Sequence, residues 1–126
     1  MPDFEIIKFK ISFLNFVLCN ADGLVFTVTL EGYLVVIDSR NGNIVRMTNI
    51  FEQIKKYKKN NIKPEGFIVG KDEIYLSLNN GKLIIIDIKT GRSKNILKID
   101  NGKISRPYVL NNNMYIVRDN AVLKLN

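Results

Sequence analysis

The segment from Asp72 to Arg92 reads DEIYLSLNNGKLIIIDIKTGR, and close copies of it stand on both sides along the chain. Its pattern predicts a strand at 74–78, a turn at 79–81, a second strand at 83–86 and a second turn at 87–91. One copy starts 49 residues earlier, at Val25, and another starts 40 residues later, at Met114. Repeats at this spacing are typical of a β-propeller, in which each blade is a four-stranded antiparallel sheet.

The repeats predict an all-β fold, a partial β-propeller of about three four-stranded blades and about twelve strands, in a single domain at 1–126. The blades are expected at 13–50, 65–99 and 105–126, with a basic, partly helical insert at 51–64. Residues 4–11 nearly alternate apolar and charged side chains, as does the outer strand predicted at 95–99. We therefore expect a further outer strand at 4–11, which would mean that the chain begins in the middle of a blade.

The third strand of each repeat is almost continuously aliphatic, which predicts burial on both faces. These strands are Leu34–Ile37, Leu83–Ile86 and Val122–Leu125. Three blades cannot close around an axis, because closed propellers use about four to eight. The end blades are therefore expected to expose apolar faces, and to cover them by self-association or by pairing with blades on another polypeptide.

The turns repeat an Asp that is followed, three and four residues later, by Asn-Gly or Thr-Gly. The carboxylate can accept backbone N–H groups of the turn, and the glycine can adopt the positive φ that closes it. A calcium-binding or catalytic carboxylate is the less favoured alternative. In the third copy Ala121 replaces the glycine, and Asn120 is expected to adopt the left-handed conformation. The predicted structural turn residues are Asp38, Asn41, Gly42, Asp87, Thr90 and Gly91.

The chain carries 19 Lys and Arg against 12 Asp and Glu, a net charge of +7, and the insert at 51–64 holds +4 of it. Phe51, Ile54 and Tyr57 have helical spacing, but a solvated loop is the favoured interpretation. The alternative is a patch for phosphate or anionic lipid. That patch would consist of Lys55, Lys56, Lys58, Lys59 and Lys63.

The sequence lacks the residue types of several common catalytic and metal-binding sites. The chain has no His, which removes histidine bases and the commonest zinc ligand, and its acidic residues are scattered. Cys19 is the only cysteine and cannot form an intrachain disulfide. We therefore predict no catalytic residue, cofactor or metal site. The first twenty residues lack a signal-peptide pattern, and no apolar run approaches the ~20 residues that cross a bilayer.

The strand-turn-strand text with Asp-x-x-Thr-Gly resembles the pyrroloquinoline-quinone-type propeller repeats. Within that class, the order of segments resembles the C-terminal portion of BamB-type outer-membrane assembly lipoproteins. The segments that carry this resemblance are 64–70, 104–111 and 114–117. It implies a non-catalytic, periplasmic scaffold at the outer membrane, whose protein partner is the central barrel-assembly component.

Two departures from that family accompany the resemblance. A tryptophan that docks neighbouring blades is replaced by Arg46 and Asn95, so some packing between blades is expected to differ. Family members have about eight blades, a signal peptide and a lipidated Cys, so this chain looks like a C-terminal fragment or a split product. Cys19 lies within a predicted strand and is not expected to be that lipid anchor.

Two alternatives belong to other functional classes. The first is a fragment of a quinone-dependent dehydrogenase, which would need calcium-binding acids, a stacking tryptophan and a vicinal cysteine pair. The chain has no tryptophan and one cysteine. The second is a basic propeller module that binds anionic lipid or, less favoured, nucleic acid through the lysine-rich insert.

Overall fold

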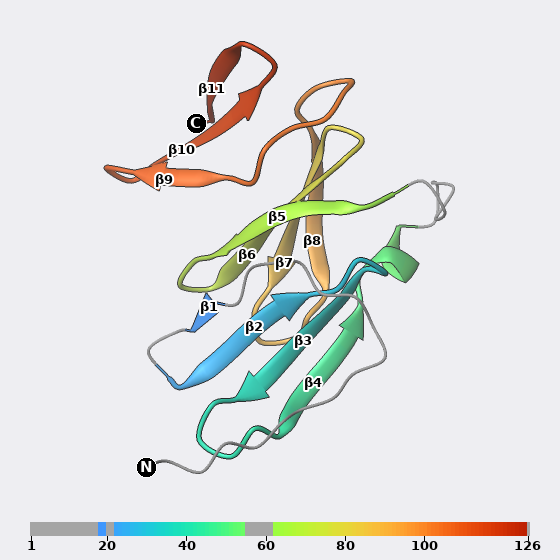
Figure 1. The fold of residues 1–126 in the computed structure, drawn as a ribbon, viewed down its shortest axis with the longest axis vertical. Coiled ribbons are helices and arrows are strands. Elements are labelled where there is room, and N and C mark those ends of the chain that lie inside the picture. The colour runs from blue at the N-terminus through green and yellow to red at the C-terminus, as the bar shows by residue number, and fades with distance from the viewer. Residues whose placement is uncertain (1–17, 20–21, 55–61, 126) are drawn as a thin grey trace.

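The structure is a computed structural model that describes residues 18–19, 22–54 and 62–125. In this part of the chain eleven strands form three antiparallel sheets, and a 3-10 helix is the only helix. The sheets follow one another along the long axis of the molecule (Figure 1). The chain is therefore an all-β partial propeller, and we call the sheets blades 1, 2 and 3 in chain order.

Each blade is a meander in which strands adjacent in sequence pair with one another. Blade 1 consists of β1 (Leu18–Cys19), β2 (Leu24–Val28), β3 (Tyr33–Asp38) and β4 (Ile44–Asn49). Blade 2 consists of β5 (Pro64–Val69), β6 (Glu73–Leu78), β7 (Lys82–Asp87) and β8 (Ser93–Lys98). Blade 3 consists of β9 (Tyr108–Leu110), β10 (Asn113–Arg118) and β11 (Ala121–Leu125), and the helix η1 (Phe51–Gln53) connects blades 1 and 2.

Alternation along the strands gives each blade two faces, because successive side chains point to opposite sides of a sheet. We call the face toward the next blade in chain order the far face, and the opposite one the near face. The far face of blade 1 packs on the near face of blade 2 in a large apolar core. Its fully buried members include Phe26, Val28 and Leu34 from blade 1, and Ile74, Leu76, Leu78, Ile84 and Ile86 from blade 2.

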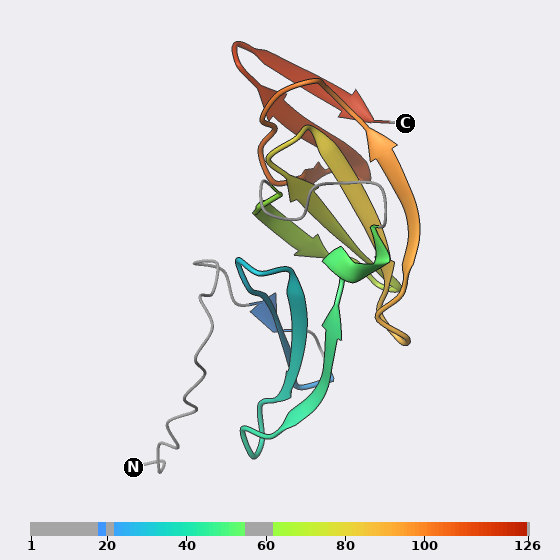
Figure 2. The ribbon, with the colours of Figure 1, turned by 90° about the vertical axis from the view of Figure 1, so that its right-hand side faces the viewer.

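The second interface, between blades 2 and 3, is much smaller. Its buried side chains are Leu83 of β7, Ile104 of the connecting segment and Ile116 of β10. Partly buried side chains surround them, among them Tyr75, Met114 and Leu125. Figure 2 shows the three sheets one above another along the long axis, with blade 2 between the other two.

The prediction that every third strand is buried on both faces is right for the first copy and wrong for the last. In β3, Leu34 and Val35 point to opposite faces and are both fully buried. In β11, Val122 is 67% exposed. Val122 lies on the far face of blade 3, on which no sheet packs in the described part of the chain.

The turn between β10 and β11 also differs from the prediction. Arg118 pairs directly with Ala121, so Asp119 and Asn120 form a two-residue turn. Positive φ falls on Asp119, at 38°, and not on Asn120. The corresponding turn in blade 2 is one residue longer and places Gly81 at φ 82°. Without a glycine, the third copy closes its hairpin with a shorter turn.

The interpretation of the insert as a solvated loop is wrong for its described residues. Phe51, Ile54 and Ile62 are only 3–6% exposed and belong to the core between blades 1 and 2. Phe51 lies on Gly32, which has φ 93°, and a Cβ there would come within 2.2 Å of the ring. The sequence favoured a loop because a run of lysines lies between Ile54 and Ile62, so that the apolar residues do not form a continuous strand or helix pattern.

The helix η1 ties the connection to blade 2 by polar contacts as well. The Gln53 side chain donates from Nε2 to the carbonyl of Gly91 at 3.2 Å. Its Oε1 accepts the backbone N–H of Ser93 at 2.6 Å. One side chain thereby satisfies two backbone groups near the start of β8, and η1 lies at the junction of the two blades (Figure 1).

Candidate functional site

A cleft of ≈ 700 Å³ opens between blades 1 and 2, at the end where their β1–β2, β5–β6 and β7–β8 turns meet. Its apolar lining includes Leu24, Val45 and Ile88. Charged side chains of both signs also line it, three acidic and three basic, and they are Asp22, Asp72, Asp87, Arg46, Lys71 and Lys89. A cleft with apolar walls and a few polar groups is the usual form of a binding site in a folded protein.

Arg46 joins the two walls of this cleft. Its side chain extends from β4 and donates two hydrogen bonds across the interface, from Nη1 to the carbonyl of Lys89 and from Nη2 to that of Ile88. Its Nε is buried without a hydrogen-bond partner among the described residues. Arg46 is one of the two positions at which the resemblance described above implies a blade-docking tryptophan, and it joins the blades by polar contacts instead. Asn95, the second replacement, is exposed on β8 and makes no comparable contact in the described structure.

Asp87, on the same cleft, is engaged by its own turn. Its Oδ1 accepts the N–H of Lys89 at 2.8 Å and that of Thr90 at 3.1 Å. The backbone N–H of Thr90 is the main cause of the lowered pKa of the Asp87 carboxyl. Gly91 follows with φ 74°. This carboxylate caps a turn and is ionised at neutral pH.

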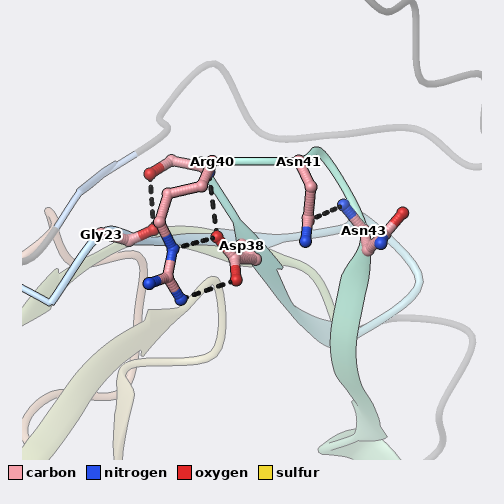
Figure 3. A network of polar contacts seen from close by, with 6 residues as sticks. Gly23, Asp38, Arg40, Asn41 and Asn43 are labelled. Atoms are coloured by element: carbon pink, nitrogen blue, oxygen red, sulfur yellow. Dashed lines mark hydrogen bonds and ion pairs between the residues drawn. The ribbon is translucent and has the colours of Figure 1, made fainter.

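The same arrangement closes the β3–β4 turn of blade 1 (Figure 3). Asp38 accepts from the backbone N and the side-chain Nε and Nη2 of Arg40, at 2.9–3.0 Å. The side-chain hydrogen bond from Arg40 is the main cause of the lowered pKa of Asp38. Asn41 accepts the N–H of Asn43 at 2.9 Å, and Gly42 has φ 74°. The six turn residues singled out in the sequence thus lie in two equivalent turns.

A further polar group lies on the other face of blade 2, toward blade 3, and was not identified from the sequence. Lys94 Nζ is 2.9 Å from Glu73 Oε2, and the hydroxyl of Tyr75 donates to Glu73 Oε1 at 3.0 Å. The hydrogen bond from Lys94 is the main cause of the lowered pKa of Glu73, and burial raises the pKa of Tyr75. Glu73 and Tyr75 share a face because they are two apart on one strand, but their partner Lys94 on β8 requires the tertiary fold.

The remaining sequence-predicted site is the lysine patch of the insert. Lys63 is exposed, and its backbone N–H donates to the Asn79 side chain at 3.0 Å. The other four lysines, 55, 56, 58 and 59, lie outside the described residues. The anionic-partner patch therefore stays a prediction. In the residues that the structure describes, no group of three potential metal ligands comes together, and no helix is long and apolar enough to cross a membrane.

Comparison with known proteins gives a fold and no family. No family model and no curated protein matches the sequence. Among solved structures, Sqt1 from Saccharomyces cerevisiae matches with a TM-score of 0.66 at 18% identity, over 82% of this chain and 28% of that one. BamB from Moraxella catarrhalis matches with a TM-score of 0.61 at 16% identity, over 86% of this chain and 30% of that one. AztD from Citrobacter koseri matches with a TM-score of 0.54 at 16% identity, over 69% and 24%.

These neighbours are propeller proteins, and at such identities the likeness shows the fold alone. The chain spans less than a third of the length of each of them. The arrangement of the sheets is thus a BamB-like partial propeller, a fold that serves unrelated functions.

Proposed function

We propose that this chain is part of a non-catalytic propeller scaffold that binds a protein partner in the periplasm, at the outer membrane, as the resemblance to BamB-type lipoproteins implies. The observation that carries the proposal is the structural match to BamB over 86% of the chain. The sequence features that suggested the same family lie in blades 2 and 3 and the segment between them. The partner expected from that resemblance is the central barrel-assembly component.

The chemistry of the cleft supports binding in preference to catalysis. Asp87 is held by turn amides, and Glu73, which pairs with Asp87 between β6 and β7 but does not line the cleft, is held by Lys94 and Tyr75. Carboxylates with lowered pKa are poor general acids or bases at neutral pH, since the best catalytic pKa lies near the working pH. The sequence contains no histidine that could act instead.

The cleft is the surface that we assign to the partner. Its apolar lining offers burial area, and its six charged side chains, three of each sign, offer specificity through matched charges. Lys71 and Lys89 are exposed on its rim, on the β5–β6 and β7–β8 turns. A partner loop with apolar side chains and an acidic flank fits this rim best.

The test is titration calorimetry between the purified chain and the purified periplasmic domains of the barrel-assembly component from the same organism. The double charge reversal Lys71→Glu with Lys89→Glu is expected to raise the dissociation constant at least about tenfold, or ~1.4 kcal/mol. The control is Glu31→Lys, an exposed charge on the β2–β3 turn at the opposite end of blade 1. Absence of binding by the unmodified chain, or equal losses in both variants, would contradict the proposal.

The enzymatic alternative has a direct test of its own. The purified chain is incubated with calcium and pyrroloquinoline quinone, and quinone binding and alcohol-dependent dye reduction are measured. We expect neither. Stoichiometric quinone binding with turnover would contradict the scaffold function and indicate a fragment of a dehydrogenase.

A further inference from the structure

The dipeptide Asn-Gly occurs three times in the sequence, at Asn41, Asn80 and Asn101. Asparagine is a thermolabile residue, and before glycine, the least hindered residue, its side chain can cyclise without an enzyme. The glycine nitrogen attacks the side-chain Cγ, so that a new C–N bond forms and the Cγ–Nδ2 bond breaks. The proton of that nitrogen leaves with the amide group as ammonia, and water opens the succinimide ring to aspartate or isoaspartate. The glycine nitrogen must therefore be free to reach Cγ, which a fixed turn prevents.

The first of these dipeptides is closed by the β3–β4 turn. The side-chain Oδ1 of Asn41 accepts the N–H of Asn43 at 2.9 Å, as Figure 3 shows. The N–H of Gly42 donates to the carbonyl of Asp38 at 2.8 Å. Both reacting groups are engaged in hydrogen bonds that ring closure would have to break.

The second dipeptide, in the β6–β7 turn, is closed in the same way. The side-chain Oδ1 of Asn80 accepts the N–H of Lys82 at 3.2 Å. The N–H of Gly81 donates to the carbonyl of Leu78 at 3.2 Å, and Gly81 is buried. Here too the side chain and the attacking nitrogen are held apart by the turn.

The third dipeptide is open. Asn101 and Gly102 are both exposed in the segment that connects blades 2 and 3, and the Asn101 side chain makes no hydrogen bond to a described residue. The N–H of Gly102 donates to no backbone carbonyl in the described chain, and it contributes to the lowered pKa of Asp100 only after the Arg118 side chain. A Cβ at Gly102 would meet only Asp100 Oδ2, at 3.8 Å, so the surroundings leave room for the ring.

Asn101 also lies where the connecting segment packs on blade 2. The N–H of Asp100 donates to the carbonyl of Gly81 at 3.2 Å, and its Oδ1 pairs with Arg118 of blade 3 at 2.7 Å. A Cβ at Gly81 would come within 2.1 Å of the Asp100 carbonyl oxygen and 2.7 Å of that of Gly102. The backbone on both sides of Asn101 is thus in close contact with one glycine of blade 2.

We propose that Asn101 is a modification site, which converts spontaneously to isoaspartate, and that this conversion loosens the attachment of blade 3. Isoaspartate directs the main chain through the side-chain carbons, which adds a carbon atom between the two residues that pack on Gly81. It also leaves a new carboxylate beside that of Asp100, and like charges repel. Both changes act on the segment that holds blade 3 through the pair of Asp100 with Arg118.

The first experiment measures where the chain deamidates. The full 126-residue chain is kept in mildly alkaline buffer, folded or in denaturant, and peptide mapping by mass spectrometry follows the three asparagines. In the folded chain Asn101 should convert at least about tenfold faster than Asn41 and Asn80, since those two sites must first break two hydrogen bonds each. In denaturant the three rates should be similar, because all three residues precede glycine. Equal rates in the folded chain, or a faster rate at Asn41 or Asn80, would overturn the site.

The second experiment measures the consequence for blade 3. Enzymatic methylation counts the isoaspartate at Asn101, and hydrogen exchange compares the aged chain with the fresh one. The N–H of Ser105 donates to the carbonyl of Val117 at 2.9 Å, and it should exchange at least about threefold faster in the aged chain. The amides of β3 in blade 1 should exchange at an unchanged rate.

The matched control is Gly102→Ala, which places a methyl group in open space and hinders ring closure at Asn101. Circular dichroism checks that this variant keeps its β signal, and after the same ageing its exchange should equal that of the fresh chain. Unchanged exchange once isoaspartate has formed, or equal loosening in the aged variant, would overturn the effect on blade 3. Neither experiment involves the barrel-assembly partner, whose binding is measured separately.

Discussion

The two interfaces between blades use the same two repeat positions with opposite chemistry. Phe51 lies on the turn glycine Gly32 of blade 1, and Asp100, 49 residues later, lies on the equivalent glycine, Gly81, of blade 2. In each case the residue before them donates its N–H to the glycine carbonyl, Ile50 to Gly32 and Ile99 to Gly81. The hydrogen bond is therefore the same, but the group that lies on the glycine is the Phe51 ring in the first case and the backbone carbonyl of Asp100 in the second.

The residue of the following blade that faces this position also changes from apolar to charged. Leu78 of blade 2 is fully buried in the core that contains Phe51. Arg118 of blade 3, 40 residues later, forms an ion pair with Asp100, with Nη1 2.7 Å from Oδ1. The first interface is thus held by apolar burial and the second by a partly exposed ion pair around a small core. The comparison teaches that one shared hydrogen bond, from the connecting segment to a turn glycine, accompanies two different ways of holding neighbouring blades together.

The largest expected effect breaks the first interface. Phe51→Ala removes a ring that is 4% exposed, and should lower the free energy of unfolding by about 3–5 kcal/mol. Chemical denaturation followed by circular dichroism measures the change. Glu52→Ala, an exposed neighbour in the same turn, is the control and should change stability by less than about 0.5 kcal/mol. A small effect of Phe51→Ala would mean that the connection is not part of the core.

A second variant tests the polar part of the first interface. Arg46→Lys keeps the charge but cannot reproduce the two hydrogen bonds to the carbonyls of Ile88 and Lys89. We expect a loss of about 1–3 kcal/mol in the same measurement. Arg92→Lys, an exposed arginine at the start of blade 2's outer strand, is the matched control. Equal stability of the two variants would show that Arg46 does not join the blades.

The second interface should depend on pH. The Arg118 side chain is the main cause of the lowered pKa of Asp100, whose ordinary value is about 3.9. A lowered folded-state pKa contributes stability that is complete above the ordinary value and is lost as the pH falls through the folded one. Arg118→Gln should therefore make the loss of stability between about pH 5 and pH 3 shallower.

Denaturation at several pH values measures this slope. Lys98→Gln, an exposed lysine at the end of β8, is the control and should keep the slope of the unmodified chain. An unchanged slope in Arg118→Gln would mean that the ion pair does not hold blade 3.

The smallest effect concerns a buried hydroxyl in the second interface. Ser77 is fully buried, and its Oγ has no hydrogen-bond partner among the described residues. Since an unsatisfied buried hydroxyl is destabilising, Ser77→Ala should be neutral or raise the unfolding free energy by up to about 1 kcal/mol. The equivalent residue of blade 1 is Val28, and Val28→Ser should instead destabilise the first interface. Destabilisation by Ser77→Ala would indicate a hydrogen bond that the structure does not show.

The repeat made most of the fold predictable. Turn chemistry at Asp38 and Asp87 and the aliphatic strands are local signals, and the three sheets lie where the repeats predicted strands and turns. The core role of Phe51 was not predictable, because it depends on Gly32, 19 residues away, leaving room for the ring. The cleft was not predicted, since the sequence indicated only that the packing between blades would differ at Arg46. Its charged lining comes from three separate turns, which no spacing in the sequence relates.

The contacts of Gln53 have a consequence for how the molecule can be divided. This side chain follows blade 1 in the sequence, yet it completes the backbone hydrogen bonds at the beginning of β8 in blade 2. The segment that repeats in the sequence therefore differs from the segment that contains all the contacts of blade 2, because the latter also includes the connection that precedes β5. A shortened protein that retains an ordered second blade would need to start at Ile50, fourteen residues ahead of the first strand of that blade.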